Sequence, residues 1–400
     1  MIKNKYSNKL VTLLIFSVLL CLFGTVQASA AEPSRVTGLE SSDSTPCARF
    51  GHGMVYDESN QQVVLFGGSA ANDGRSSLAD TWVFNCTSDT WLELNPTTRP
   101  SARSDHSMVY DSVNQQVILF GGWSDETWIF DPQSNQWTEV TSANHPSSRQ
   151  SAGMYFDPVN QQVVLFGGYL NDDSHAGDTW IFDPATHTWT EVFPSSVPAA
   201  RYGHSMVYDS VNQRGILFGG RVTALQSETW VYDYSSNSWT KLYPTLKPKA
   251  RYWHGAAFDT DNESMILFGG DDEGPGRSSN DIWAFSSQDE GWVEFSPELE
   301  PVARIGHSLV YDSLNQRTLL FGGLGNDYKD SYGDTWAYDC LGSSWTHLVG
   351  PDYSNSSPST SSSLSSTSSG AISTPGFGLS SIVISIGVIS FLLVARKKSG

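Results

Sequence analysis

Six arginines recur at similar intervals through the middle of this 400-residue chain. They are Arg49, Arg103, Arg149, Arg201, Arg251 and Arg304. As a ring at the mouth of a channel they could bind an anion. An acid, however, follows each of them at a matching place: Asp80, Glu126, Asp178, Glu228, Asp281 and Asp334. Matched cations and anions favour a repeated ion pair, so we predict that the arginines support the fold.

Histidine follows five of these arginines by three positions. These residues are His52, His106, His204, His254 and His307, and the third unit has Ala152 instead. A ring of imidazoles could hold a metal ion. No acid or cysteine accompanies them at a fixed spacing, so we expect histidines that pack and bond to the backbone. We therefore predict no metal site.

Seven aromatic residues fall outside the repeated pattern, either in segments that vary between the units or directly after a repeat arginine. They are Trp123, Tyr169, Tyr202, Tyr252, Trp253, Tyr328 and Tyr332. Exposed aromatic faces with Asp or Asn nearby suit sugar rings, and they suit protein partners too. We take these seven as ligand-binding candidates and prefer a protein partner to a glycan.

Acidic loops at 171–173, 271–273 and 326–327 could hold calcium. They lack the regular ladder of acids and the later glutamate that an EF-hand loop needs. A solvated loop is the simpler interpretation. We predict no cofactor, with calcium as the alternative.

All these residues belong to a unit that occurs six times, starting at each repeat arginine. Every unit has a double glycine: 67–68, 121–122, 167–168, 219–220, 269–270 and 322–323. A pair of tryptophans follows: 82/91, 128/137, 180/189, 230/239, 283/292 and 336/345. Each unit contains four short β-rich runs separated by turn residues. One such sheet cannot bury both faces alone, but six arranged radially can.

This pattern resembles the kelch repeat over residues 49–348. The resemblance implies an all-β, six-bladed kelch-type β-propeller with four-stranded antiparallel blades starting at residues 49, 103, 149, 201, 251 and 304. It does not imply a function, because kelch propellers include adaptors, lectin-like modules and some enzymes. A carbohydrate-acting enzyme, oxidase or sugar epimerase-like, is the alternative to a binding module. We find no catalytic constellation in the sequence and predict no catalytic residue.

Antiparallel strand order places the repeat arginines, the double glycines and the loops after them on one face. These loops differ strongly in length and composition: 69–79, 123–125, 169–177, 221–227, 271–280 and 324–333. A constant framework with variable loops is how scaffolds carry binding sites. We therefore predict a non-catalytic module that recognises a protein or glycan through this variable-loop face.

The two ends of the chain predict export and membrane attachment. Residues 1–30 have the basic start, apolar run and small residues of a signal peptide, and 31–48 form an N-terminal segment. A Ser/Thr-rich stalk (349–376), an uncharged apolar segment (377–395) and a basic tail (396–400) follow the repeats. These predict a single transmembrane helix with a cytoplasmic tail and the propeller outside the cell. The Pro375-Gly376-Phe377 tripeptide resembles archaeal PGF-type sorting signals, which implies a processed lipid anchor as the alternative.

The net charge of −19 excludes nucleic acid as a partner, because an acidic surface repels phosphate backbones. Outside the cell, cysteines pair and sequons carry glycans. The disulfide candidates are Cys47, Cys86 and Cys340, and the glycosylation candidates are Asn85, Asn262 and Asn355. We expect one disulfide, with the choice of pair open.

Overall fold

The computed structural model describes residues 45–70, 76–272, 277–326 and 329–354, all within one compact unit, Met1–Ser357. Within these residues the secondary structure is β-strand, and no helix is long and apolar enough to cross a membrane. The predicted signal peptide, transmembrane segment and tail lie outside the described residues, as does most of the stalk. So do the candidates Tyr328 and Asn355.

Each sequence unit folds into an antiparallel sheet built on four main strands, which confirms the six predicted four-stranded blades, and in blade 3 the short strand β12 (Arg149–Gln150) adds a fifth strand to the sheet. Blades 1 and 2 are built from β2 (Gly53–Asp57), β3 (Gln62–Phe66), β6 (Thr81–Asn85) and β7 (Thr90–Leu94), then β8 (His106–Asp111), β9 (Gln116–Gly121), β10 (Thr127–Asp131) and β11 (Gln136–Val140). Blades 3 and 4 are built from β13 (Gly153–Asp157), β14 (Gln162–Leu170), β15 (His175–Asp183) and β16 (Thr188–Val192), then β17 (Ser205–Asp209), β18 (Arg214–Phe218), β19 (Thr229–Asp233) and β20 (Ser238–Leu242). Blades 5 and 6 are built from β21 (Gly255–Asp259), β22 (Ser264–Phe268), β23 (Ile282–Ser286) and β24 (Gly291–Phe295), then β25 (Ser308–Asp312), β26 (Arg317–Phe321), β27 (Thr335–Asp339) and β28 (Ser344–Val349).

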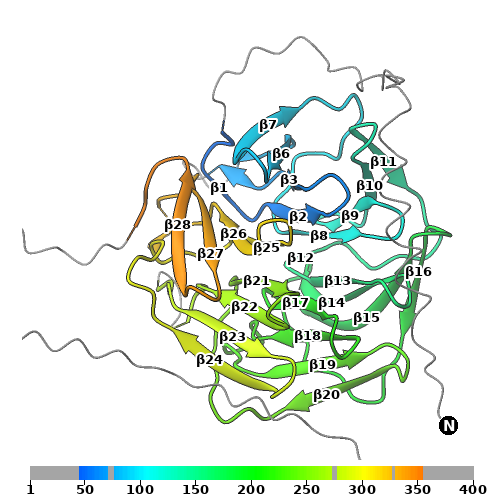
Figure 1. Cartoon of the computed structure of the whole chain (residues 1–400). Helices are drawn as coiled ribbons and strands as arrows, with labels where there is room; N and C mark the ends of the chain where they lie inside the picture. Colours follow the sequence, from blue (N-terminus) through cyan, green and yellow to red (C-terminus); the bar gives the residue numbers. More distant parts are fainter. Residues whose placement is uncertain (1–44, 71–75, 273–276, 327–328, 355–400) are drawn as a thin grey trace, which may run out of the picture. The chain divides into compact units, whose positions relative to one another are not determined.

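The first strand of each blade is the innermost, and the six first strands form a closed ring around a common axis (Figure 1). Their order is β2, β8, β13, β17, β21, β25 and back to β2. In blades 1, 3, 4, 5 and 6, short pairings or single bridges join the start of the unit to the loop after its double glycine, so the two share one face. Strand β1 (Arg49–Phe50) pairs with β4 (Ser69–Ala70), which also pairs with β5 (Ser76–Ser77), and β12 (Arg149–Gln150) pairs with the end of β14.

A buried aspartate ends the first strand of each blade and organises the turn that follows. In blade 4, Asp209 Oδ1 accepts hydrogen bonds from the backbone N–H groups of Val211 and Asn212, both at 3.1 Å. Its Oδ2 accepts a 2.9 Å hydrogen bond from Asn212 Nδ2. The last turn residue, Gln213, has a φ of 53°. The Asp-x-x-Asn-Gln pattern is therefore a side-chain-capped turn.

Apolar side chains from facing sheets form the core between each pair of neighbouring blades. In five blades the indole Nε1 of the second tryptophan donates to a threonine hydroxyl of the preceding blade, as Trp292 does to Thr229 at 3.0 Å. In blade 6, Trp345 Nε1 is buried and has no partner. Ile282 occupies the place of that threonine in blade 5 and is fully buried. The tryptophan pairs thus serve blade packing, as predicted.

The predicted disulfide is wrong for the three cysteines of the described chain, which are all free. Cys86 packs in the core shared by blades 1 and 6, whereas Cys340 packs against the core shared by blades 5 and 6. Equivalent positions in neighbouring blades therefore lie on opposite sides of the blade 6 sheet, and Cys47 is exposed near the start of blade 1. Burial raises the pKa of Cys340 to about 11.

The two glycosylation candidates in the described residues differ in their surroundings. Asn85 is the exposed last residue of β6, where its Oδ1 accepts a 2.9 Å hydrogen bond from Thr87 N in the following turn. The Asn262 amide nitrogen instead donates a 2.8 Å hydrogen bond to the buried carboxylate of Asp259. Glycosylation remains a prediction, and Asn85 is the more accessible acceptor of the two.

Candidate functional site

The six repeat arginines are ion-paired within their own blades, as the sequence predicts. All six are buried, and Arg49 makes a two-pronged contact to Asp80 with N–O distances of 2.8 and 2.7 Å. The same carboxylate accepts a 2.7 Å hydrogen bond from Trp82 Nε1. Burial alone would raise the pKa of Asp80, but hydrogen bonds and charge from Arg49 outweigh it and lower the pKa. These guanidinium groups have their partners and hold the blade together.

Five of the seven aromatic candidates form one continuous series of ring contacts across the variable-loop face, from blade 2 to blade 5. The ring centroids are 5.9 Å apart for Trp123 and Tyr169, and 5.1 Å apart for Tyr169 and Tyr202. They are 6.0 Å apart for Tyr202 and Tyr252, and 4.4 Å apart for the stacked pair of Tyr252 and Trp253. We call these five residues the aromatic arc.

Exposure varies along the aromatic arc. Trp123 is 48% exposed, Tyr252 is buried, and the other three members are partly buried. Two residues not singled out by sequence reasoning join it. His175 lies 5.0 Å from the Tyr202 ring, and the Arg221 guanidinium lies 5.6 Å above the Tyr252 ring. A part of the arc therefore packs under the loops while Trp123 stands open to a partner.

Tyr332 does not belong to this arc. Its ring lies 4.5 Å from the Arg304 guanidinium and 4.9 Å from the Tyr353 ring. Backbone hydrogen bonds tie it to the start of blade 1, because Arg49 N donates to Tyr332 O at 3.0 Å. Its place at the joint between the last and first blades indicates a role in packing.

Backbone hydrogen bonds form a closed circle around the axis at the variable-loop face. Each is donated by the residue two places after a repeat arginine and accepted by the same position in the preceding blade. The N–O distances lie between 2.7 and 2.9 Å for Gly51 to Gly306, Asp105 to Gly51, Ser151 to Asp105, Gly203 to Ser151, Trp253 to Gly203 and Gly306 to Trp253. All six residues have a φ between 52° and 66°, a region that favours glycine. Three of the six nevertheless carry side chains.

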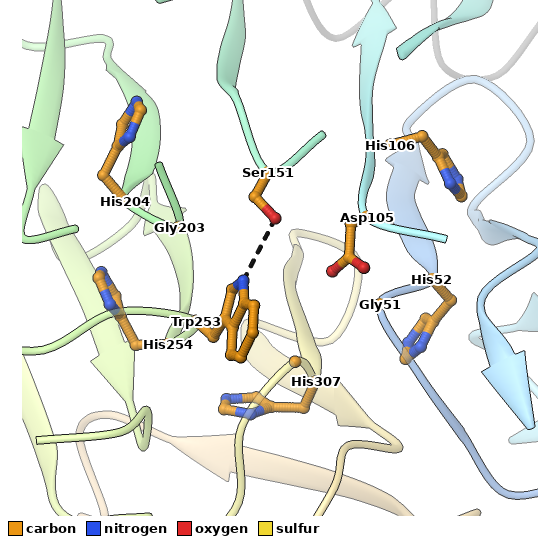
Figure 2. Close-up of a pocket in the computed structure, with 11 residues that line it drawn as sticks. Gly51, His52, Asp105, His106, Ser151, Gly203, His204, Trp253, His254 and His307 are labelled. Atoms are coloured by element: carbon orange, nitrogen blue, oxygen red, sulfur yellow. Dashed lines mark hydrogen bonds between the residues drawn. The ribbon is translucent and has the colours of Figure 1, made fainter. Parts of the chain in front are cut away.

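Those three side chains, Asp105, Ser151 and Trp253, stand at the axis, and Figure 2 shows five imidazoles placed around them. Together they line a cavity of about 130 Å³. Trp253 Nε1 donates a 3.2 Å hydrogen bond to Ser151 Oγ, which fixes the indole across the axis. The series of ring contacts thus ends at the axial cavity.

The five histidines are packed between the blades, as predicted, and they are buried. His307 Nε2 lies 3.1 Å from the Phe268 carbonyl oxygen, and His254 Nε2 lies 2.8 Å from Ser205 Oγ. Burial, followed by the charge of the nearby arginine, lowers the pKa of His106, His204 and His307 to about 3. Within the described residues, no three His, Cys, Asp or Glu side chains are grouped so as to hold a metal ion.

Asp105 is a residue of the axial cavity that sequence reasoning missed. Its carboxylate has one hydrogen-bond donor given by the structure, Ser104 Oγ at 3.3 Å. Burial raises its pKa to about 6. The signal was present in the alignment of the six units, since glycine occupies this position at 51, 203 and 306 and a charged residue there is exceptional.

Below the axial cavity, the first strands enclose a wider and mainly apolar space of about 350 Å³, lined among others by Met54, Met108 and Leu309. Apolar walls on this side and polar groups at the variable-loop face give the axis two different ends. The polar end is the one that the arc reaches.

Comparisons with known proteins agree with this architecture. Residues 26–220 match the family model described as the KLHDC2/KLHL20/DRC7 Kelch-repeats domain, and residues 163–372, just over half of the chain, match the Attractin/LZTR1 beta-propeller. Over 75 residues, 19% of the chain, it is 35% identical to Mei4-dependent protein 6 of Schizosaccharomyces pombe. That alignment covers 10% of the relative, so the chain matches only about a tenth of its length. With its six four-stranded blades, the chain belongs to the Attractin/LZTR1 beta-propeller family and is a kelch-repeat propeller.

Proposed function

We propose that this chain is a non-catalytic binding module that recognises a protein partner through the aromatic arc on its variable-loop face. Kelch and related β-propeller domains commonly mediate protein interactions, which is compatible with a binding module. The observation that carries the proposal is the arc itself. Its ring contacts connect four blades and lead from exposed Trp123 to the axial cavity.

Trp123 has the properties of an interface hot spot. It is 48% exposed and has a φ of 65°, which is unusual for a bulky side chain. Strained backbone that holds an exposed aromatic ring is commonly found at functional sites. Tryptophan and tyrosine dominate the binding energy of protein interfaces because they bury a large area with few rotatable bonds.

A glycan is the second candidate, and one contact favours it. Tyr169 Oη donates a 2.8 Å hydrogen bond to Asp173 Oδ1 next to the Trp123 ring. A flat ring beside carboxylate and hydroxyl groups can stack on a sugar and bond to its hydroxyls. A carbohydrate-acting enzyme of the kelch type is the alternative to both binding functions.

We propose the place of action from the composition of the chain ends, whose residues lie outside the described structure. We place the propeller at the cell surface, exported by the signal peptide at 1–30 and held by the segment at 377–395. That segment acts either as a retained helix or as the signal for a processed lipid anchor. Partners of the propeller are then proteins or glycans of the surface and its surroundings.

Site-specific photocrosslinking in intact cells tests the proposal. A photoreactive residue replaces Thr223, which is exposed in the loop beside the arc. We expect crosslinking to a defined protein, reduced about tenfold or more by Trp123→Ala, because losing a hot-spot side chain costs more than 1–2 kcal/mol.

Tyr243→Ala is the matched control, since this tyrosine is 83% exposed and lies outside the arc. Equal losses for the two variants would contradict a role of the arc. A parallel glycan array with the full chain separates the two candidate ligands, because binding that depends on Trp123 would assign the arc to sugar.

A further inference from the structure

We propose that the axial cavity of the variable-loop face binds a primary ammonium group, with Asp105 as its counter-ion, as presented by a lysine side chain of a protein partner. This deepens the proposed function and rests on it for the source of the lysine. The binding of the ammonium group itself stands on the geometry of the cavity.

The size of the cavity suits one cationic side-chain head. Its volume is about 130 Å³, and its walls are the imidazoles around Asp105, Ser151 and Trp253 (Figure 2). A water molecule occupies roughly 30 Å³ in the liquid, so the cavity has room for an ammonium group with a short alkyl stem. It is too small for a folded element or a whole sugar chain.

Asp105 supplies negative charge that nothing in the cavity balances. Of the described side chains lining this space, Asp105 alone carries a carboxylate. The repeat arginines, which precede the histidines by three positions, are each paired with the acid of their own blade, as Arg103 is with Glu126. An unpaired carboxylate in a partly buried place is unfavourable, and a cation of the right size removes that cost.

Five histidines contribute to the wall of the cavity around Asp105. Nδ1 of His52, His106, His204, His254 and His307 is buried and has no partner within the protein. In His307 the other nitrogen, Nε2, lies 3.1 Å from the Phe268 carbonyl oxygen and accepts a 3.2 Å hydrogen bond from the Gly255 backbone N–H. Because one of these neighbours accepts and the other donates, they do not select one tautomer of the ring. We therefore take the imidazoles as the polar wall of the cavity and Asp105 as the group that binds the cation.

The imidazoles do not repel a cation, because burial lowers their pKa values and keeps them neutral. That of His204 falls to about 3, and the pKa of His52 and His254 also lies well below its usual value. An anion would instead meet the carboxylate of Asp105. The net charge of −19 on the chain further favours cations over anions.

Trp253 connects the cavity to the aromatic arc. Its indole is held by Ser151 at 3.2 Å and stacks on Tyr252 at 4.4 Å. The face of an indole ring attracts an ammonium group through its quadrupole. A partner segment that lies along the arc would therefore bring a lysine to the axis.

The test is a titration of the full chain with Nα-acetyl-lysine N-methylamide at pH 7.5. Binding is followed by the indole N–H NMR signal of Trp253, assigned with the variant Trp253→Phe. We expect a saturable shift that is absent with the Nε-acetylated probe. Asp105→Asn should weaken binding at least tenfold, while Asp125→Asn, which alters an exposed acid of the same face, should leave it unchanged.

Asparagine suits the backbone at position 105, where φ is 56°, so the variant keeps the fold while losing the charge. Absence of binding, or equal binding by Asp105→Asn, would overturn the proposal. Glucosamine forms a second arm, and binding of this amine in place of the lysine probe would overturn the lysine assignment. Trp123→Ala should leave the affinity for the probe unchanged, because Trp123 does not line the cavity. The titration therefore tests ammonium binding by the cavity separately from partner binding by the aromatic arc.

Discussion

At the scale of single residues, Asp105 shows how one side chain changes the character of a repeated position. Gly51, Gly203 and Gly306 occupy the same place in other blades, and the backbone has positive φ in all of them. The aspartate keeps the closed circle of backbone hydrogen bonds and adds a carboxylate at the axis. Burial raises its pKa to about 6, compared with an ordinary value near 3.9.

Asp105→Asn should therefore stabilise the protein in a pH-dependent way. A carboxyl whose pKa is raised by folding holds its proton more tightly in the native state, so its contribution is fully present below about pH 4 and is lost as the pH rises to about 6. We expect equal stability of the variant and the parent at pH 4. At pH 7.5 the variant should be more stable by about 2–3 kcal/mol.

Urea unfolding at a series of pH values measures this difference. Taking the difference between the two proteins removes the contribution of the buried histidines, which has the opposite sign. Their pKa values are lowered, so they stabilise the native state above about pH 6.5 and lose this effect on acidification. A difference that does not change with pH would show that Asp105 ionises normally.

The repeated ion pairs should differ in strength according to burial. Arg304 and Asp334 are both fully buried, whereas Glu126, the partner of Arg103, is 36% exposed. Asp334→Asn should cost about 3–5 kcal/mol because it leaves a buried guanidinium uncompensated. Glu126→Gln should cost about 1 kcal/mol, since water screens that pair. Chemical denaturation checks both, and equal costs would argue against burial as the cause.

At the scale of elements, the blades were predictable because their signals are local. The double glycines, the tryptophan pairs and the capped turns each report on a few neighbouring residues, so all six sheets and the arginine–acid pairs follow from them. Contacts between blades do not follow in the same way. Tyr169 and Tyr202 belong to different units, and only the packing of blade 3 against blade 4 places their rings together.

The cysteines also show that contacts between blades do not follow from the repeat pattern. Cys86 and Cys340 are equivalent in sequence and belong to adjoining blades, yet each packs against a different face of blade 6. Sequence equivalence places two residues at the same height and radius in a propeller. It does not place them within the distance that a disulfide requires.

The second tryptophan of each blade offers a matched pair for testing packing between elements. Trp292 and Trp345 are both buried, but Trp292 donates to Thr229 whereas Trp345 faces Ile282 and has no acceptor. Trp292→Phe should cost about 1–2 kcal/mol more than Trp345→Phe, because only the former loses a buried hydrogen bond. Urea denaturation of the two variants measures this difference in the free energy of unfolding. Equal decreases would mean that the volume of the indole, and not its hydrogen bond, sets the loss of stability.

At the scale of the whole propeller, the ring closes between blades 6 and 1 without a covalent link between the described first and last strands. Apolar side chains of both blades share one core there. At the outer edge Arg317 Nη2 lies 2.5 Å from Asp89 Oδ1, and Asn315 Nδ2 donates a 2.8 Å hydrogen bond to the Cys86 carbonyl. Backbone bonds close the inner edge, where Gly51 N donates to Gly306 O at 2.7 Å.

An equivalent ion pair and hydrogen bond join the outer edges of blades 4 and 5. There Arg214 Nη2 lies 2.8 Å from Glu290 Oε1, and Asn212 Nδ2 donates to the Ser287 carbonyl at 2.8 Å. Burial of the two arginines is nearly equal, at 15% exposed for Arg317 and 16% for Arg214. The difference is that the chain runs directly from blade 4 into blade 5. Separation at that joint is therefore limited by the connecting segment, whereas the joint between blades 6 and 1 can open by losing non-covalent contacts alone.

Arg317→Ala should consequently promote local opening of the ring much more than Arg214→Ala. The amides of Arg49, Gly51 and Gly323 report on the joint between blades 6 and 1, because each donates its hydrogen bond across it. We expect their hydrogen exchange in native conditions to rise about fivefold to thirtyfold in Arg317→Ala, the effect of about 1–2 kcal/mol on an opening equilibrium. The corresponding amides of Gly220, Arg251 and Trp253 should change much less in Arg214→Ala. Equal changes at the two joints would mean that the propeller opens only by global unfolding, with closure of the ring no weaker than its other joints.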